Sequence, residues 1–455
     1  MRRLIVLLFF SVAVLAFVVD VHAAVAFPGA QGFGKDAVGG RGGEVIAVTN
    51  LNNAGPGSLR EACEADGRRT VVFRVGGTIE LRSPIEIKNP FITIAGQTAP
   101  GGGVLLKHAG NEGFVKGLVL IRTNNVIIRH LRFRRGPSAE GEDTGDCLFM
   151  GQKDSGSVHD VMIDSCSFSW STDELVDVYY NSRNVTLQNC IFSEALEWST
   201  HKEGNEYQPH SMAVFCAFSA RNVTVYKSLF AHNRTRNPRF YSKTAGVKEF
   251  QFINNVIYNY HTGSVFASSS GGVNVDSVGN KYIAGEATDT DKREVFVGGG
   301  GKLFIHDNRS PHRWWSSQSQ WLPVGDDPNS KYRSFSAFTD YSSFPLINSN
   351  SIAGSLLYKV GATRPARDSV DARVVQDVWD RTGEIIDDPK EVGGWPSIAN
   401  GYAPKDRDDD GMPDWWEEQH SFNRFDSSDR NGDEDSDGYT NLEEFLNQTA
   451  PRRAD

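Results

Sequence analysis

The chain has 455 residues, of which 39% are hydrophobic and 23% charged, which fits a globular protein and excludes an intrinsically disordered one. The net charge is −10, but residues 401–455 hold 16 acidic and 6 basic side chains, and the rest of the chain holds 41 of each. The acidity therefore belongs to the tail, and the sequence shows neither the basic stripe of a nucleic-acid-binding protein nor zinc-ligand spacing.

The chain begins with a targeting segment. Arg2 and Arg3 precede a largely apolar run of 16 residues, 4–19, which is short for a membrane span. Small residues follow up to Ala23. We therefore interpret residues 1–23 as a signal peptide, which predicts a secreted protein, extracellular or periplasmic, with no membrane span in its mature form. Further on, Ser58 and Glu61 have the spacing of a capping box and predict a short helix over one end of the fold.

Six later segments share one alternating pattern of apolar and other residues, followed by a polar residue at the fifth position. They start at Val126, Val161, Val185, Val223, Phe250 and Val273. The fifth positions are His130, Ser165, Asn189, Lys227, Asn254 and Ser277, where we expect the chain to turn. Such alternation indicates strands, and near-regular spacing indicates stacked coils that bury a common core. The prediction is an all-β parallel solenoid; the alternative, an antiparallel sandwich, lacks its two-residue Asn-Gly turns.

The chain has five cysteines, Cys63, Cys147, Cys166, Cys190 and Cys216. An odd number at irregular spacing does not make a disulfide framework. Cys166 and Cys190 occupy the same position of the repeat, which favours a stack of small buried side chains over a bridge.

Carboxylates cluster in the long coils, at Asp146, at Asp173 and Asp177, and at Glu194. Calcium prefers such oxygen ligands, and stacked coils can bring distant residues into one site. Each acid taken alone is also compatible with a solvated loop. The segment 232–240, HNRTRNPRF, adds three arginines, which suit bidentate recognition of carboxylates or an ordinary surface loop.

The acidic tail matches the 12-residue EF-hand loop twice, each time with the glycine of the sharp turn and the terminal glutamate. The matching ligand positions are Asp406, Asp408, Asp410, Asp414 and Glu417, then Asp433, Asp435, Asp437, Asn441 and Glu444. This predicts a small helical calcium-binding module at 405–455, joined by a linker at 397–404 to a main domain at 24–396. A solvated acidic tail is the alternative.

With these motifs in view, residues 26–396 resemble polysaccharide lyase family 1, the pectate lyases, of the bacterial secreted type. The resemblance rests on AFPGAQGFG, GGRGGEVIAVTNLNNAGPGSLREA, TIAGQTAPGGG, DELVD, HNRTRNPRF and GATRPARDSVDARVV with GGWP, in that order. It implies a right-handed parallel β-helix and calcium-dependent elimination of α-1,4-linked polygalacturonate to 4,5-unsaturated oligogalacturonates. The partner it implies is an acidic plant cell-wall polysaccharide, with the enzyme acting as a monomer.

The resemblance also implies roles for single residues. The family's acid-x-x-x-Asp pair matches Asp173 and Asp177, and its Gly-Asp matches Asp146, so these would bind the catalytic Ca²⁺. The arginine of its Arg-x-Pro pattern matches Arg236, which would act on the substrate. The catalytic-loop cation is assigned to Lys202, with His210 as the competitor.

One departure concerns a further arginine that the family often has three residues after the proline. Here that position is Tyr241, so Arg239 is assigned to substrate binding together with His210. Three other functions stay open from the sequence: a polygalacturonan hydrolase, a non-catalytic glycan-binding β-helix, and a lyase for another uronate polymer.

Overall fold

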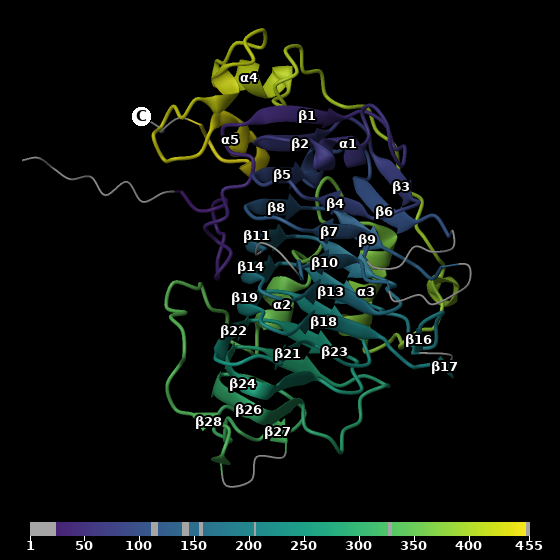
Figure 1. Cartoon of the computed structure of the whole chain (residues 1–455), viewed down its shortest axis with the longest axis vertical. Helices are drawn as coiled ribbons and strands as arrows, with labels where there is room; N and C mark the ends of the chain where they lie inside the picture. Colours follow the sequence, from purple (N-terminus) through teal and green to yellow (C-terminus); the bar gives the residue numbers. More distant parts are fainter. Residues whose placement is uncertain are drawn as a thin grey trace, which may run out of the picture.

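The alternating segments form parallel strands that wind into a β-helix (Figure 1). The structure is a computed structural model that describes residues 24–110, 117–138, 145–153, 158–203, 206–325 and 330–451. The expected signal peptide, 1–23, lies outside these residues. Each coil gives one strand to each of three stacks, and all pairings within the stacks are parallel, so the predicted right-handed parallel β-helix is confirmed.

The strands of the first stack are β1 (Glu44–Val48), β2 (Arg69–Phe73), β5 (Ile92–Ala95), β8 (Val126–Arg129), β11 (His159–Asp164), β14 (Arg183–Gln188), β19 (Arg221–Tyr226), β22 (Val247–Ile253) and β28 (Arg333–Ser334). Those of the second are β3 (Gly77–Leu81), β6 (Val104–His108), β9 (Arg132–Arg134), β12 (Ser167–Ser169), β15 (Ile191–Ser193), β20 (Leu229–Ala231), β23 (Val256–Tyr258) and β25 (Lys281–Ile283).

Those of the third stack are β4 (Ile85–Ile87), β7 (Val119–Ile121), β10 (Leu148–Met150), β13 (Glu174–Val178), β18 (Met212–Cys216), β21 (Arg239–Ser242) and β27 (Val324–Gly325). Two long strands, β24 (Ser264–Val278) and β26 (Val295–His306), pass from the third stack into the first and join them.

The register of the repeat agrees with the sequence pattern for five of the six segments. Val126, Val161, Val185, Val223 and Phe250 are partners in successive strands of the first stack. The sixth was wrong by two residues, because Phe250 pairs with Val275 and not with Val273. In that coil the chain does not turn before entering the first stack, and β24 is longer than the other strands.

The corners after these strands use the left-handed backbone region. The predicted turn positions His130, Ser165, Asn189, Lys227 and Asn254 all have φ between 47° and 55°. The prediction for Ser277 was wrong: it lies within β24, and Gly279, with φ of 67°, makes the corner. Glycine adopts this conformation without steric cost.

Side chains of like kind stack inside the coils. Phe133, Phe168, Phe192 and Phe230 lie with successive ring centroids 4.8, 5.4 and 4.9 Å apart. The residue after each corner forms a second ladder, in which Asn255, Asn280 and Asn308 each accept a hydrogen bond from the backbone of the preceding coil. These amides satisfy polar groups that the β-helix buries. All five cysteines are buried and free, as the stacking interpretation predicts.

Helices close the open surfaces of the β-helix. α1 (Leu59–Glu64) buries Leu59, Ala62 and Cys63 against the first coil, and Ser58 caps it by accepting from the Glu61 amide. Behind the second stack lie α2 (Ile352–Leu356) and α3 (Ser369–Asp380). The short helices η1 (Gly96–Thr98) and η3 (Pro389–Val392) and the hairpin of β16 (Lys202–Glu203) and β17 (Glu206–Tyr207) complete this part.

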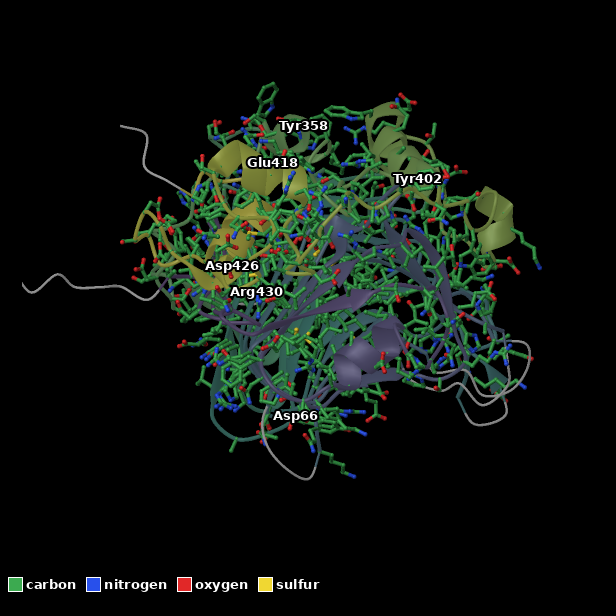
Figure 2. All side chains as sticks on the ribbon, turned by 90° about the horizontal axis from the view of Figure 1, so that it is seen from above. Asp66, Tyr358, Tyr402, Glu418, Asp426 and Arg430 are labelled. Carbon is green, nitrogen blue, oxygen red and sulfur yellow. The ribbon has the colours of Figure 1, made fainter. Side chains whose placement is uncertain are left out.

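The acidic tail forms α4 (Asp414–His420), η4 (Asp429–Asn431) and α5 (Asn441–Asn447), which pack on the N-terminal end of the β-helix. Figure 2 looks onto this end and shows the module, which carries Glu418, Asp426 and Arg430, over one side of the coil. The segment 397–404 runs along the β-helix, where the Gly102 amide donates to the Ala399 carbonyl at 2.8 Å. Within the described residues, no helix is long and apolar enough to cross a membrane.

Candidate active site

The third stack carries the charged residues that the sequence singled out. Its neighbouring strands β13, β18 and β21 place Asp177, Phe215 and Arg239 opposite one another in register. Adjacent strands are about 4.8 Å apart. One acid, one aromatic ring and one guanidinium thus form a row across three coils, and the residues on either side of this row complete the site.

Three carboxylates from two coils meet beside that row. Asp146 precedes β10, Glu174 begins β13, and Asp177 follows in β13; they are 4%, 2% and 3% exposed. One oxygen from each lies within 4.8 Å of the others. The Glu174 amide donates to Asp146 Oδ1 at 3.3 Å, which ties the two coils together.

This cluster fits a divalent cation. Three buried carboxylates approach one another here, and Asp177 Oδ1 is buried with no hydrogen-bond partner among the described residues. Burial raises the pKa of Asp177 well above its usual value, and the Asp146 and Asp173 charges raise it further. Calcium takes oxygen ligands of this kind and would relieve both effects.

Arg236 lies directly on the cluster. It precedes β21 in the left-handed conformation, with φ of 59°, and its carbonyl accepts from the Val214 amide at 2.9 Å. Its guanidinium contacts the Glu174 carboxylate and lies 4.3 Å from the centroid of the Phe215 ring. Burial lowers the pKa of Arg236 to about 10; the Asp173 charge opposes this shift and Arg239 adds to it.

The other two arginines of the HNRTRNPRF segment have different surroundings. Arg239 lies over Phe215 and Tyr241, with centroid distances of 5.2 and 4.9 Å, so its guanidinium lies on the same aromatic ring as Arg236. Arg234 forms an ion pair with Glu197 at 2.9 Å. Arg236 and Arg239 therefore lie at the row of the third stack, and Arg234 belongs to the loop beside it.

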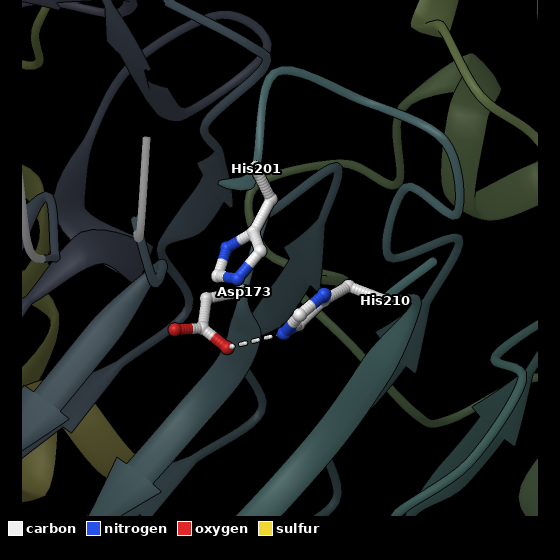
Figure 3. A group of neighbouring side chains, drawn as sticks. All are labelled: Asp173, His201 and His210. Carbon is white, nitrogen blue, oxygen red and sulfur yellow. Dashed lines mark ion pairs between the residues drawn. The ribbon is translucent and has the colours of Figure 1, made fainter. Parts of the chain in front are cut away.

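Asp173 faces two histidines (Figure 3). His210 Nε2 lies 3.6 Å from Asp173 Oδ1, and the His201 and His210 ring centroids are 3.4 Å apart. Both histidines are buried, at 3% and 4% exposure. The sequence had grouped Asp146 and Asp177 with Asp173. In the structure the third member of their carboxylate cluster is Glu174.

Sequence reasoning missed Glu174 because the family motif was matched on Asp173. The two acids are adjacent in DELVD, and the acid-x-x-x-Asp spacing fits Asp173 and not Glu174. The strand decides between them: Glu174 is the first residue of β13 and pairs in register with Met212, while Asp173 lies in the preceding turn.

Lys202 lies on the β16–β17 hairpin. Its ammonium is 4.6 Å from the ring centroid of Tyr207, a residue that is 57% exposed. His210, the competing candidate, contacts Asp173 at the edge of the carboxylate cluster. Of the two residues, His210 is the one that lies beside Asp173, next to the carboxylate cluster.

Glu194, the remaining acid of the long coils, is committed to the scaffold. It is fully buried, receives two hydrogen bonds from Arg373 at 2.6 and 2.9 Å, and accepts one from Trp170 Nε1 at 3.0 Å. It therefore holds α3 against the second stack.

The first tail loop brings its acids together. Asp406, Asp408 and Asp410 lie within 4.8 Å of one another, and Asp410 also lies within that distance of Glu417 and Asp429. Burial, followed by the Asp410 and Asp408 charges, raises the pKa of Glu417 to about 8. The sequence had not included Asp429.

In the second loop, Asp433, Asp435 and Asp437 lie within 4.8 Å of one another. Glu444, which is 2% exposed, has a pKa raised to about 7 by burial and, to a smaller extent, by the charge of Asp437. Asn441 begins α5, and its amide donates to the Asp429 carbonyl at 2.8 Å.

Comparison with known proteins supports the family. The chain is 34% identical over 442 residues to probable pectate lyase C of Aspergillus flavus, covering 94% of this chain and 95% of that protein. For the corresponding protein of Aspergillus terreus the identity is 33%, with coverage of 95% and 96%. The chain belongs to the pectate lyase family. It is thus related to these proteins over nearly its whole length.

The fold is also that of a solved pectate lyase, which superposes with a TM-score of 0.51 at 12% identity and covers 76% of this chain and 100% of that chain. The crystal structure of the major cedar pollen allergen superposes with a TM-score of 0.51 at 19% identity, covering 73% of this chain and 92% of the allergen. No family model matches the chain. The relatives with nearly full coverage are fungal, so the pectate lyase family is supported, and the bacterial secreted type remains a prediction.

Proposed function

We propose that this enzyme cleaves α-1,4-linked polygalacturonate by calcium-dependent β-elimination. The observation that carries the proposal is the contact of Arg236 with a buried group of three carboxylates on adjacent coils. A scaffold interior has no need of three acids in one cluster, because burying such charges costs free energy. A site that holds a divalent cation beside an anionic sugar does.

Elimination begins at C5 of a galacturonate residue, whose hydrogen is acidic only when the neighbouring carboxylate charge is neutralised. Bound calcium, held by Asp146, Glu174 and Asp177 with Asp173 adjacent, would neutralise that carboxylate. A base takes the C5 proton, the C–H electron pair forms the C4=C5 double bond, and the C4–O4 bond breaks. The leaving O4 gains a proton, and no water is consumed.

Arg236 is the proposed base. Burial already lowers its pKa to about 10, which makes the neutral guanidine more accessible than in water. Its position over Phe215 fixes the guanidinium relative to the carboxylates. Such preorganisation is what proton transfer by a side chain requires.

Arg239 and His210 are the proposed substrate-binding residues. Arg239 lies beside Arg236 on the Phe215 ring, where it can bind a second uronate carboxylate. His210 lies at Asp173, beside the cluster. We assign the catalytic-loop cation to His210 and give Lys202, which packs on Tyr207, a peripheral role at the hairpin.

A polygalacturonan hydrolase is the less supported alternative. Hydrolysis needs two carboxyl groups flanking the bond with room for water, and Glu194 is instead bound to Arg373 and Trp170. A methyl-esterified substrate would lack the carboxylate charge that a calcium ion held by the acid cluster would neutralise. The free-acid polymer is therefore the proposed substrate, and the proposed enzyme is secreted after loss of residues 1–23 and acts as a monomer.

We also propose that the tail, residues 405–455, binds calcium in a structural role, through its two EF-hand-like loops. The module packs against the first coils through Trp416 of α4 and Leu446 of α5, whereas β13, β18 and β21 lie further along the β-helix (Figure 1). Measuring unsaturated product from polygalacturonate with and without calcium tests the catalytic proposal. Product formation by Arg236→Ala at the wild-type rate would refute the role of Arg236.

A further inference from the structure

Asp429 lies outside both EF-hand-like loops, yet its carboxylate lies within the first one. It begins the short helix η4 between the loops, and one of its oxygens is within 4.8 Å of ligand atoms of Asp410 and Glu417. Its Oδ2 accepts from the Asn423 amide at 3.1 Å, which fixes the side chain, and Oδ1 has no hydrogen-bond partner among the described residues.

The residue that the loop pattern assigns to position nine is occupied elsewhere. Asp414 Oδ1 accepts from the Arg407 amide at 3.0 Å, and Oδ2 pairs with the Arg407 guanidinium at 2.5 Å. Both carboxylate oxygens of Asp414 are thus bound by Arg407, a residue of the same loop. Asp414 is also missing from the groups of carboxylates that approach one another among the described residues.

Glu417 independently indicates a cation at this point. Its side chain is fully buried, and neither carboxylate oxygen has a hydrogen-bond partner in the described part of the chain. Asp410 is also fully buried, with an unpartnered Oδ2. Buried carboxylate oxygens of this kind need a compensating charge, since an unpaired buried charge is strongly unfavourable.

We infer that Asp429 is a ligand of the calcium ion in the first tail loop, in place of Asp414, and that it links this ion to the second loop. The inference rests on the proposal that the tail binds calcium. The ligands at the first loop are then Asp406, Asp408, Asp410 and Glu417 together with Asp429.

The link runs through the backbone of Asp429. Its carbonyl accepts from the side-chain amide of Asn441, which is position nine of the second loop, and the Asn441 amide nitrogen of the main chain donates to the Gly432 carbonyl at 2.8 Å. Filling the first loop therefore orders η4 and the entry to α5 together. Calcium binding to the two loops is expected to be positively coupled.

The test is calcium titration by calorimetry on the full-length mature protein carrying Asp177→Asn and Glu444→Gln, which leaves the first tail loop as the intact proposed site. Asp429→Asn is compared with Asp414→Asn and with Asp426→Asn, an exposed acid of the same segment whose carboxylate bonds Ser428. We expect Asp429→Asn to weaken binding about tenfold or more, the scale of losing a metal-site partner. The two controls should change affinity by at most about threefold, as expected for a screened charge.

Weakening by Asp414→Asn with no effect of Asp429→Asn would overturn the inference and restore the ordinary loop. No binding at all by the parent protein would refute tail calcium binding itself, which is a different failure. Melting in chelator checks that the variants fold alike. With Glu444 restored, Asn441→Asp, which keeps an oxygen ligand at position nine but loses the donor to the Asp429 carbonyl, should remove the coupling between the two loops while each still binds calcium, and unchanged coupling would contradict the link.

Discussion

The two acidic sites of this enzyme are built in opposite ways. Asp146, Glu174 and Asp177 come from two coils and meet through strand pairing, with Arg236 in contact with them. The first tail loop collects most of its acids from 12 consecutive residues, and its glutamate is buried with no hydrogen-bond partner among the described residues. In the first site the Arg236 guanidinium contacts the carboxylates and is placed to act on a substrate. In the second site Glu417 is fully buried. The first is suited to catalysis and the second to stability.

The largest expected effect is at Arg236. Arg236→Lys keeps a positive charge but loses the planar guanidinium over Phe215, and we expect elimination to fall by about 10³-fold or more. The melting temperature should stay close to that of the wild type, because Arg236 acts on the substrate and not on the core. Initial rates of unsaturated product, with Arg234→Lys as the matched control, measure this. A rate near wild type would contradict the assignment.

The next largest effect concerns Glu174, which lies in the carboxylate cluster of the structure but was not part of the ligand set taken from the sequence motif. Glu174→Gln is expected to reduce activity about 100-fold at low calcium, with partial recovery as calcium is raised, because one ligand charge is lost. Asp160→Asn, a carboxylate of the first stack that bonds Asn184, serves as the control. If Glu174→Gln left the calcium requirement unchanged while Asp173→Asn raised it, the sequence-based ligand set would stand instead.

A smaller effect is expected from the loop cations. His210→Asn should lower activity about tenfold, because His210 adjoins Asp173 at the cluster, and Lys202→Ala should lower it at most about twofold. Steady-state kinetics on polygalacturonate at saturating calcium compare the two. The reverse order would return the catalytic-loop role to Lys202.

The smallest effect on activity is expected in the tail, where stability changes instead. Glu417→Gln should leave the catalytic rate unchanged and lower the melting temperature in calcium by about 5 °C, the scale of losing a tightly bound ion. In chelator the same variant should melt no lower than the wild type, because the carboxyl that it replaces is buried without a hydrogen-bond partner among the described residues. Equal melting with and without calcium in the wild type would contradict a calcium site in the tail.

The parts of the fold that repeat could be predicted from the sequence. The strands that contain the Val161 and Val185 segments, and the corners at Ser165 and Asn189, follow from local alternation that is repeated in each coil. The shift at Val275 could not be predicted, because β24 passes between stacks without a corner.

The site was less predictable than the fold for the same reason. Spacing located the DELVD segment and selected Asp173, but the side chain that joins the carboxylate cluster is Glu174, and that depends on which residue starts β13. Asp429 was missed because no loop pattern includes a residue 12 positions after Glu417. Contacts between separate segments determine both residues, and local patterns do not encode them.

The most direct test of the central claim is the ultraviolet absorbance of polygalacturonate incubated with the mature enzyme, in calcium and in chelator, beside Arg236→Ala. The account predicts a rise from the new C4=C5 double bond in calcium, no rise in chelator and none with the variant. New reducing ends without absorbance would contradict elimination and indicate hydrolysis, and a rise that persists in chelator would contradict the calcium site formed by Asp146, Glu174 and Asp177.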